Sequence, residues 1–224
     1  MVYQIMKSKW RVFFESLIFT LLILIIGFSI GFYIENSRMN TLIQDYKNFE
    51  VNALDLKLQE SYYTTMNNNS CSIALASNLI FADNIYNTGL ALEKYETSNQ
   101  ISNNNDILNE KKQYVLLKTE LWMNSIILKN KCNNPFHTMV YVYSQYPSLS
   151  EDSEQKAVSN ILGAIKSEKG NEIILIPIAG DLNLDSVNLM LKSYNITGSP
   201  AIIIDEKYIL TGFQSQQEIE KYLN

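Results

Sequence analysis

An uncharged apolar segment near the N-terminus constrains this chain more than any other feature. Residues 16–34 are 19 consecutive residues without a charged side chain, and most of them are Leu, Ile or Phe. A helix rises about 1.5 Å per residue, so about 20 residues cross the ~30 Å hydrocarbon layer of a membrane. The segment therefore predicts a transmembrane helix over residues 16–35.

Two alternatives compete with a membrane anchor. A cleaved signal peptide has an apolar region of about 7–15 residues followed by a small-residue cleavage site. Here the run is longer and ends in Gly31-Phe32-Tyr33-Ile34-Glu35, without an A-x-A pattern. A buried helix of a soluble protein is less favoured still, so the prediction is a signal-anchor.

The charges that flank the apolar segment predict its orientation. Lys7, Lys9 and Arg11 precede the segment, whereas only Glu35 and Arg38 follow it closely. Because positive residues stay on the cytoplasmic side, residues 1–15 are expected in the cytoplasm and the later domains outside. The predicted location is the cell membrane, with a single crossing and with lipid as one partner.

Composition narrows the remaining classes. The net charge of −5 and the sequence pI near 5.0 argue against nucleic acid as a partner, because phosphate binding needs a basic surface. One His and two Cys residues give too few ligands for a metal site, and we expect no metal and no cofactor. A hydrophobic share of 46% excludes a globally disordered chain.

Residues 36–134 predict an all-α stalk domain. A seam at helical 3-4-3-4-3 spacing begins it, formed by Met39, Leu42, Tyr46, Phe49, Ala53 and Leu56. The seam could form a coiled coil that dimerises the protein, or it could pack against two later helices of the same chain. The intramolecular alternative is favoured, because the seam is under three heptads long and contains Tyr and Ala. The later helices are predicted over residues 72–94 and 107–131.

The two cysteines flank these later helices. Cys71 lies at the start of the first and Cys132 just past the end of the second. In an antiparallel helical hairpin those two ends are neighbours, and the outside of a cell is oxidising, so a Cys71–Cys132 disulfide is predicted. Two free buried thiols and a redox-active pair are the alternatives.

Residues 135–224 change to an alternating pattern of strands and helices, which predicts an α/β domain. The expected strands are 138–144, 172–178, 201–204 and 208–210, and the expected helices are 151–169, 185–194 and 215–223. The order β-α-β-α-β-β-α predicts a mixed sheet with helices on both faces. Its first two strands should be parallel with a right-handed connection, and its last two an antiparallel hairpin.

The order of these elements and one local motif resemble the thioredoxin-like fold family. The motif is Tyr-Asn-Ile-Thr-Gly-Ser-Pro-Ala-Ile-Ile-Ile-Asp over residues 194–205, followed by Gly212-Phe213. The resemblance covers about 90 residues and implies a cis Ser199–Pro200 bond. Redox-active relatives carry C-x-x-C after the first strand, but residues 144–152 contain no cysteine, so that chemistry is not carried over.

The resemblance also implies a peptide groove between two loops. Its candidate residues are Tyr146, Pro147, Ser148, Ser199 and Pro200. The backbone before the proline pairs with substrate strands in relatives, so a binding role by strand addition is predicted. The alternative is a vestigial groove in which the proline only serves the fold.

These observations favour a non-enzymatic protein that binds or scaffolds a protein or peptide partner outside the membrane. A thiol-disulfide oxidoreductase or isomerase using Cys71 and Cys132 is the competing class, and a subunit of a larger membrane assembly is a third. His137 is interpreted as a structural residue. Two sequons begin at Asn68 and Asn195; glycosylation is expected at the exposed Asn68 break, and crowding near the proline disfavours it at Asn195.

Overall fold

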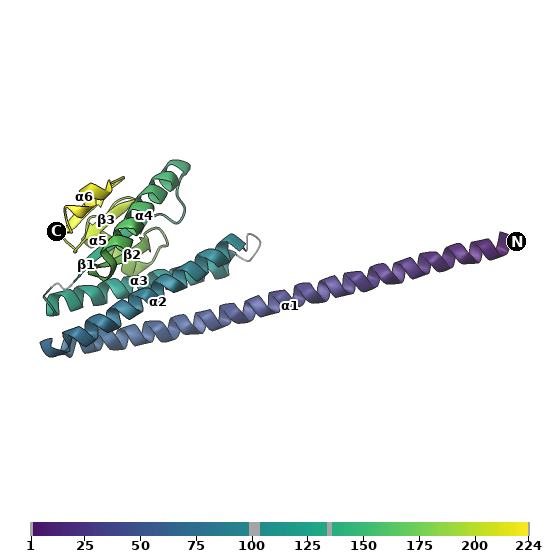
Figure 1. Ribbon diagram of the computed structural model, residues 1–224, viewed down its shortest axis with the longest axis horizontal. Coiled ribbons are helices and arrows are strands. Elements are labelled where there is room, and N and C mark those ends of the chain that lie inside the picture. The colour runs from purple at the N-terminus through teal and green to yellow at the C-terminus, as the bar shows by residue number, and fades with distance from the viewer. Residues whose placement is uncertain (1, 99–103, 134–135, 224) are drawn as a thin grey trace. The chain divides into compact units, whose positions relative to one another are not determined.

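The computed structural model describes residues 2–98, 104–133 and 136–223, and the chain divides into two compact units, Met1–Asn48 and Phe49–Asn224 (Figure 1). Helix α1 (Val2–Thr65) begins in the first unit and ends in the second. Within it, Trp10–Ile34 is long and apolar enough to cross a membrane, and none of it is buried inside the chain. A helix that is apolar on all sides is typical of a lipid-facing segment.

Polar side chains inside this apolar segment are satisfied by the helix itself. The hydroxyl of Thr20 donates to the carbonyl oxygen of Ser16 at 2.8 Å, and that of Ser29 donates to the carbonyl of Ile25 at 2.8 Å. Hydrocarbon offers no partner for a free hydroxyl, so these local bonds remove the cost of placing Ser and Thr there.

The second unit starts with three helical segments, which are the end of α1, α2 (Cys71–Ser98) and α3 (Asn104–Lys131). The predicted break after α1 is present as a short 3-10 turn, Asn68–Ser70. Of the seam predicted for the stalk, Leu56 is fully buried within the chain and Ala53 is exposed. The side chains of Met39, Leu42, Tyr46 and Phe49 lie outside the described residues.

A four-stranded mixed sheet follows, with the strand order β2-β1-β3-β4. The strands are β1 (His137–Tyr143), β2 (Ile173–Ala179), β3 (Ala201–Ile204) and β4 (Tyr208–Thr211). β1 and β2 are parallel, β1 and β3 are antiparallel, and β3 and β4 form an antiparallel hairpin. The predicted parallel first pair and antiparallel last pair are both confirmed.

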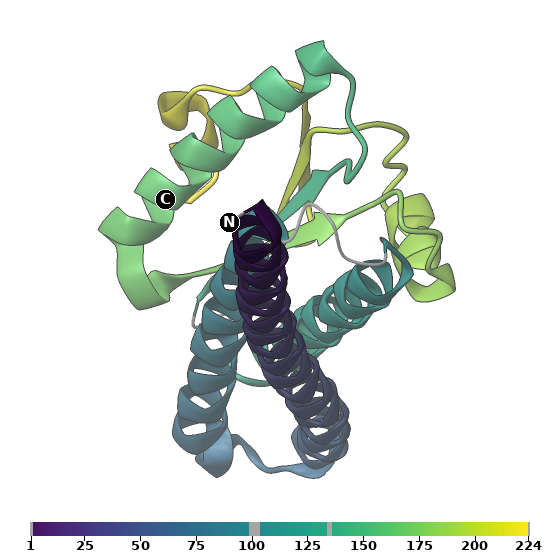
Figure 2. The same ribbon diagram turned by 90° about the vertical axis from the view of Figure 1, so that its right-hand side faces the viewer.

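Helices cover both faces of this sheet (Figure 2). On one face, α4 (Leu149–Lys169) and α6 (Gln216–Glu220) pack against alternate strand residues; the buried members of this core include Met139, Val158, Leu162, Ile202 and Ile219. α5 (Asp185–Ser193) and α3 pack on the other face, in a core that includes Trp122, Leu128, Val140, Ile176 and Val187. α2 and the end of α1 pack on α3. The α-helical part and the sheet thus share one core. The predicted domain boundary between residues 134 and 135 stays a prediction.

Candidate functional site

The loop that leaves β1, residues 144–148, is called the exit loop below, and an aspartate that follows β2 fixes it. The carboxylate of Asp181 accepts hydrogen bonds from the Ser144 hydroxyl at 2.6 Å, the Gln145 amide at 2.7 Å and the Tyr146 amide at 3.1 Å. Burial opposes ionisation of Asp181, but these three donors together with the Asp181 amide outweigh it and hold the pKa of the carboxyl below its usual value. The exit loop is therefore held by hydrogen bonds from its own chain.

A second set of bonds ties the same loop to α4. The side chain of Gln155 accepts from the Ser144 amide and donates to the Ser144 carbonyl at 3.4 Å. The Tyr141 hydroxyl of β1 donates to the Gln155 carbonyl at 2.9 Å. Gln155 is buried, so these bonds are shielded from water and hold the start of the exit loop against the helix.

The exit loop ends at the N-terminus of α4. Ser148 caps this helix through a capping box, in which its hydroxyl accepts from the Glu151 amide and its own amide donates to the Glu151 carboxylate at 2.8 Å. The backbone bond from Ser148 lowers the pKa of Glu151. Two side chains near the cap lie in solvent: Tyr146 is 69% exposed and Leu149 is 92% exposed.

The second predicted element is the segment 197–200, called the Pro200 turn below. The Ser199–Pro200 bond is cis, as the resemblance implied, and Pro200 is buried. The Pro200 carbonyl accepts from the Gly212 amide at 2.8 Å. Within the described part of the chain, the backbone groups of Gly198 and Ser199 make no hydrogen bond. Two donors and two acceptors are therefore open at this turn.

Strand register brings the exit loop and the Pro200 turn to the same end of the sheet. Val142, next to the end of β1, pairs with Ala201, the first residue of β3. The exit loop that follows β1 and the Pro200 turn that precedes β3 must then leave the sheet side by side. Among the described residues, no hydrogen bond joins the two, so the predicted residues share an edge without closing on each other.

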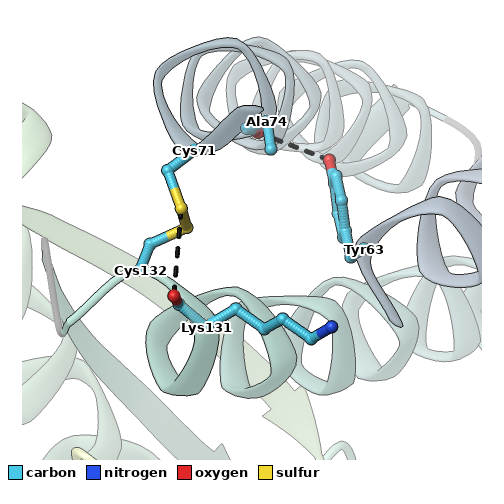
Figure 3. Close-up of a disulfide and its surroundings, with 5 residues drawn as sticks. All are labelled: Tyr63, Cys71, Ala74, Lys131 and Cys132. Carbon is cyan, nitrogen blue, oxygen red and sulfur yellow. Dashed lines mark hydrogen bonds between the residues drawn. A yellow bond between two sulfur atoms is a disulfide. The ribbon is translucent and has the colours of Figure 1, made fainter. Parts of the chain in front are cut away.

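The disulfide lies on the helices rather than on this edge. Cys71, the first residue of α2, is bonded to Cys132, which follows the last residue of α3, with the two Cα atoms 5.7 Å apart (Figure 3). The sulfur of Cys71 lies 3.9 Å from the Lys131 carbonyl oxygen. Beside it, the Tyr63 hydroxyl of α1 donates to the Ala74 carbonyl at 3.4 Å. The bridge joins the helix ends that the hairpin argument predicted.

A buried polar network at the opposite end of the sheet was missed from the sequence. Its members, called the Lys129 network below, are Trp122, Lys129, His137, Thr138, Asp205 and Glu206. The Lys129 ammonium of α3 donates to Asp205 at 2.6 Å and to Glu206 and the Thr138 hydroxyl at 3.0 Å each. Only 5% of the Lys129 side chain is exposed. The network joins α3 to the β3–β4 hairpin.

The other members of the Lys129 network provide further hydrogen-bond partners for the carboxylates of Asp205 and Glu206. Glu206 accepts from the Trp122 indole at 3.0 Å and from the Thr138 hydroxyl at 2.6 Å. Nδ1 of His137 lies 2.6 Å from Asp205. Burial raises the pKa of Asp205, but the bonds from Lys129 and His137 reverse that effect and leave the pKa below its usual value. His137 therefore contacts a structural network, in agreement with its interpretation.

Comparisons with known protein sequences assign no function to either end of the sheet. No model of a known protein family matches this chain, and no curated protein sequence matches it at a significant level. In the residues that the structure describes, no group of three or more His, Cys, Asp or Glu side chains could hold a metal ion. The structure thus has a candidate membrane helix, a disulfide-linked helical part and a mixed α/β sheet. At one end of that sheet, the exit loop and the Pro200 turn form a preformed, exposed surface, called the loop edge below.

Proposed function

We propose that this chain is a membrane-anchored protein with a thioredoxin-like α/β part, and that it binds extended peptides outside the cytoplasm. The order β-α-β-α-β-β-α, the parallel first pair and the closing antiparallel hairpin support that fold. Helices on both faces support it further. The function is argued from the loop edge, because a fold alone does not define one.

The proposed location outside the cytoplasm has two supports. The helix Trp10–Ile34 can span a bilayer. Lys7 and Lys9 precede it and Arg11 lies at its start, which favours the cytoplasm for that end. The disulfide between Cys71 and Cys132 fits an oxidising compartment, since cytoplasmic thiols are kept reduced in most organisms.

The observation that carries the binding proposal is the open backbone of Gly198 and Ser199. A peptide that adds beside the Pro200 turn can pair with these groups as a further strand. The exposed Tyr146 of the exit loop and Leu149, the first residue of α4, offer neighbouring apolar area, so alternate peptide side chains have a surface to contact. Because the exit loop is already fixed, binding does not have to order it.

Catalysis at this edge is disfavoured by its chemistry. The exit loop begins with Ser144, whose hydroxyl donates to the Asp181 carboxylate. A carboxyl group whose pKa is lowered is a weak base, so Asp181 orients the hydroxyl without activating it as a nucleophile. Both cysteines of the chain are held in the helical disulfide.

A peptide selection on the full chain tests the proposal. The chain is placed in lipid nanodiscs, and a random heptapeptide library displayed on phage is selected against it. The enriched peptide is then made in two versions, each N-methylated at one alternate set of amides. Strand addition predicts that one version loses binding and the other keeps it, because alternate amides of an added strand face its partner.

Variants of two tyrosines with similar exposure distinguish peptide binding at the loop edge from binding elsewhere on the surface. Tyr146→Ala is expected to weaken the dissociation constant of the selected peptide about tenfold, the loss of one aromatic contact of ~1.4 kcal/mol. Tyr86→Ala, at 64% exposure on α2, is expected to change it less than about twofold. Equal binding by both methylated peptides, equal effects of the two variants, or a selection that enriches nothing contradicts the proposal.

A further inference from the structure

The sequon Asn195-Ile196-Thr197 lies on the loop between α5 and β3. α5 ends at Ser193, and the backbone of Asn195 has a φ of 56°. Asn195 and Thr197 are both exposed, whereas Ile196 between them is half-buried. The crowding that was expected at this turn is therefore not found at the acceptor residue.

Neighbouring residues hold this loop and leave Asn195 in solvent. The ring of Tyr194 stacks on that of Trp122 with the centroids 5.4 Å apart, and Ile196 packs against the core. The Ile196 amide donates to the Leu191 carbonyl at 2.9 Å, and the Asn195 amide donates to that of Lys192 at 3.0 Å. Among the described residues, the Asn195 carboxamide has no hydrogen-bond partner.

The residue types need separate explanations. Asn is enriched in the left-handed backbone region, so the φ of Asn195 alone would account for its presence. That argument does not extend to Thr197, whose exposed hydroxyl makes no hydrogen bond within the described chain. A glycosylation acceptor requires both residues, and the structure leaves the Asn195 carboxamide and the Thr197 hydroxyl exposed and without partners in the described chain.

We infer that Asn195 is an N-glycosylation site of the exported part of the chain. The inference rests on the proposed orientation across the membrane, because the glycosyl donor acts on the outer side. The donor class is a lipid-linked oligosaccharide phosphate. Nδ2 of Asn195 attacks C1 of its first sugar, the N–C1 bond forms, the bond from C1 to the phosphate oxygen breaks, the lipid phosphate leaves and Nδ2 loses one proton.

The site has a geometric consequence for the loop edge. Asn195 is five positions before Pro200 in a loop that is anchored on both sides. A bulky, hydrated glycan attached there borders the Pro200 turn. Peptides that extend toward α5 would therefore meet the glycan, whereas peptides that extend toward the exit loop would not.

Translation of the full chain into microsomes that contain an oligosaccharyltransferase tests the site. Modification appears as a slower gel band that peptide:N-glycosidase removes. We expect the increment of the shift that comes from Asn195 to be lost in Asn195→Gln and Thr197→Ala and kept in Thr197→Ser, which retains the hydroxyl. Asn68→Gln removes the other sequon and is expected to leave that increment in place. Protease protection of the C-terminal part reads the orientation independently.

Each outcome decides the inference. A shift that depends on Asn195 and on a hydroxyl at position 197 supports it. A shift lost only in Asn68→Gln overturns it, and so does the absence of a shift in a chain whose C-terminal part is protected; the orientation and peptide binding then stand. Digestion of the C-terminal part overturns the orientation and the site together.

Discussion

Replacing Lys129 by Met removes the cation that joins α3 to the β3–β4 hairpin. The ammonium has three partners within 3.0 Å, and the side chain is only 5% exposed. Removing one member of a buried ion pair costs about 3–5 kcal/mol, because the partner charge stays buried. Asp205 and Glu206 keep 23% and 16% exposure, so water can reach them, and we expect ~3 kcal/mol.

The assay is urea unfolding of the full chain in detergent micelles. The chain has two tryptophans, and Trp10 lies in the candidate membrane helix, so Trp10→Phe leaves Trp122 as the single fluorescent reporter. Trp122 is buried and bonded to Glu206, so its emission follows the Lys129 network directly. With a slope of about 2–3 kcal/mol per molar urea, the midpoint should fall by about 1 M.

An exposed lysine provides the matched control. Lys156 pairs with Asp152 at 2.6 Å, but its side chain is 72% exposed, so Lys156→Met is expected to cost no more than ~0.5 kcal/mol. The Asp205→Asn change should cost less in the Lys129→Met background than in the parent, with a coupling of about 1–3 kcal/mol. Equal midpoint shifts for the two lysine variants, or additive effects of the double variant, would refute the assignment of a buried network.

Three further changes have defined outcomes. Burial lowers the pKa of Lys118 to about 7 although the Tyr114 ring lies 3.9 Å from its ammonium. Because the unfolded chain binds more protons between pH ~7 and ~10.5, the free energy of unfolding from urea titrations should rise with pH in that window by up to ~1.4 kcal/mol per pH unit, and Lys118→Met should abolish the rise. Asp181→Ala should speed hydrogen exchange of the two exit-loop amides, measured by mass spectrometry, while the sheet amides stay protected. Replacing Cys71 and Cys132 by Ser should lower the free energy of unfolding by about 2–4 kcal/mol in non-reducing urea titrations, and an insulin-reduction assay should show no turnover in the parent.

The elements with strong local patterns were predictable. The apolar run of β2 predicted a central strand covered on both faces, and its side chains do contribute to the cores on both faces of the sheet. The central position was wrong, because β2 lies at the edge of the sheet, where helices cover its faces but only β1 pairs with it. In α4, Val158, Leu162 and Ile165 recur at helical spacing and all three are buried. Helix ends were less accurate, because capping residues decide them: α4 begins at Leu149, after Ser148, and not at residue 151.

The Lys129 network was not predictable, because each member has a sufficient local explanation. Lys129 suits the C-terminal end of a helix, and Asp205 and Glu206 suit a short hairpin connection. Their contact joins residues 76 and 77 positions apart, and no periodicity reports such a distance. Only the structure shows that both turn residues have positive φ values, which a glutamate rarely adopts.

The two ends of the sheet differ in what remains for a partner. At the Lys129 end, α3 supplies the donors that the hairpin carboxylates need, so the polar groups are satisfied within the chain. At the other end, Asp181 fixes the exit loop, but nothing in the described chain pairs with Gly198 and Ser199. A loop that is held before binding loses little entropy when a ligand arrives, and backbone groups without a partner in the chain can exchange water for the ligand. Binding free energy can therefore be gained at this end and not at the other, which is why the loop edge, and not the larger buried network, is the candidate site.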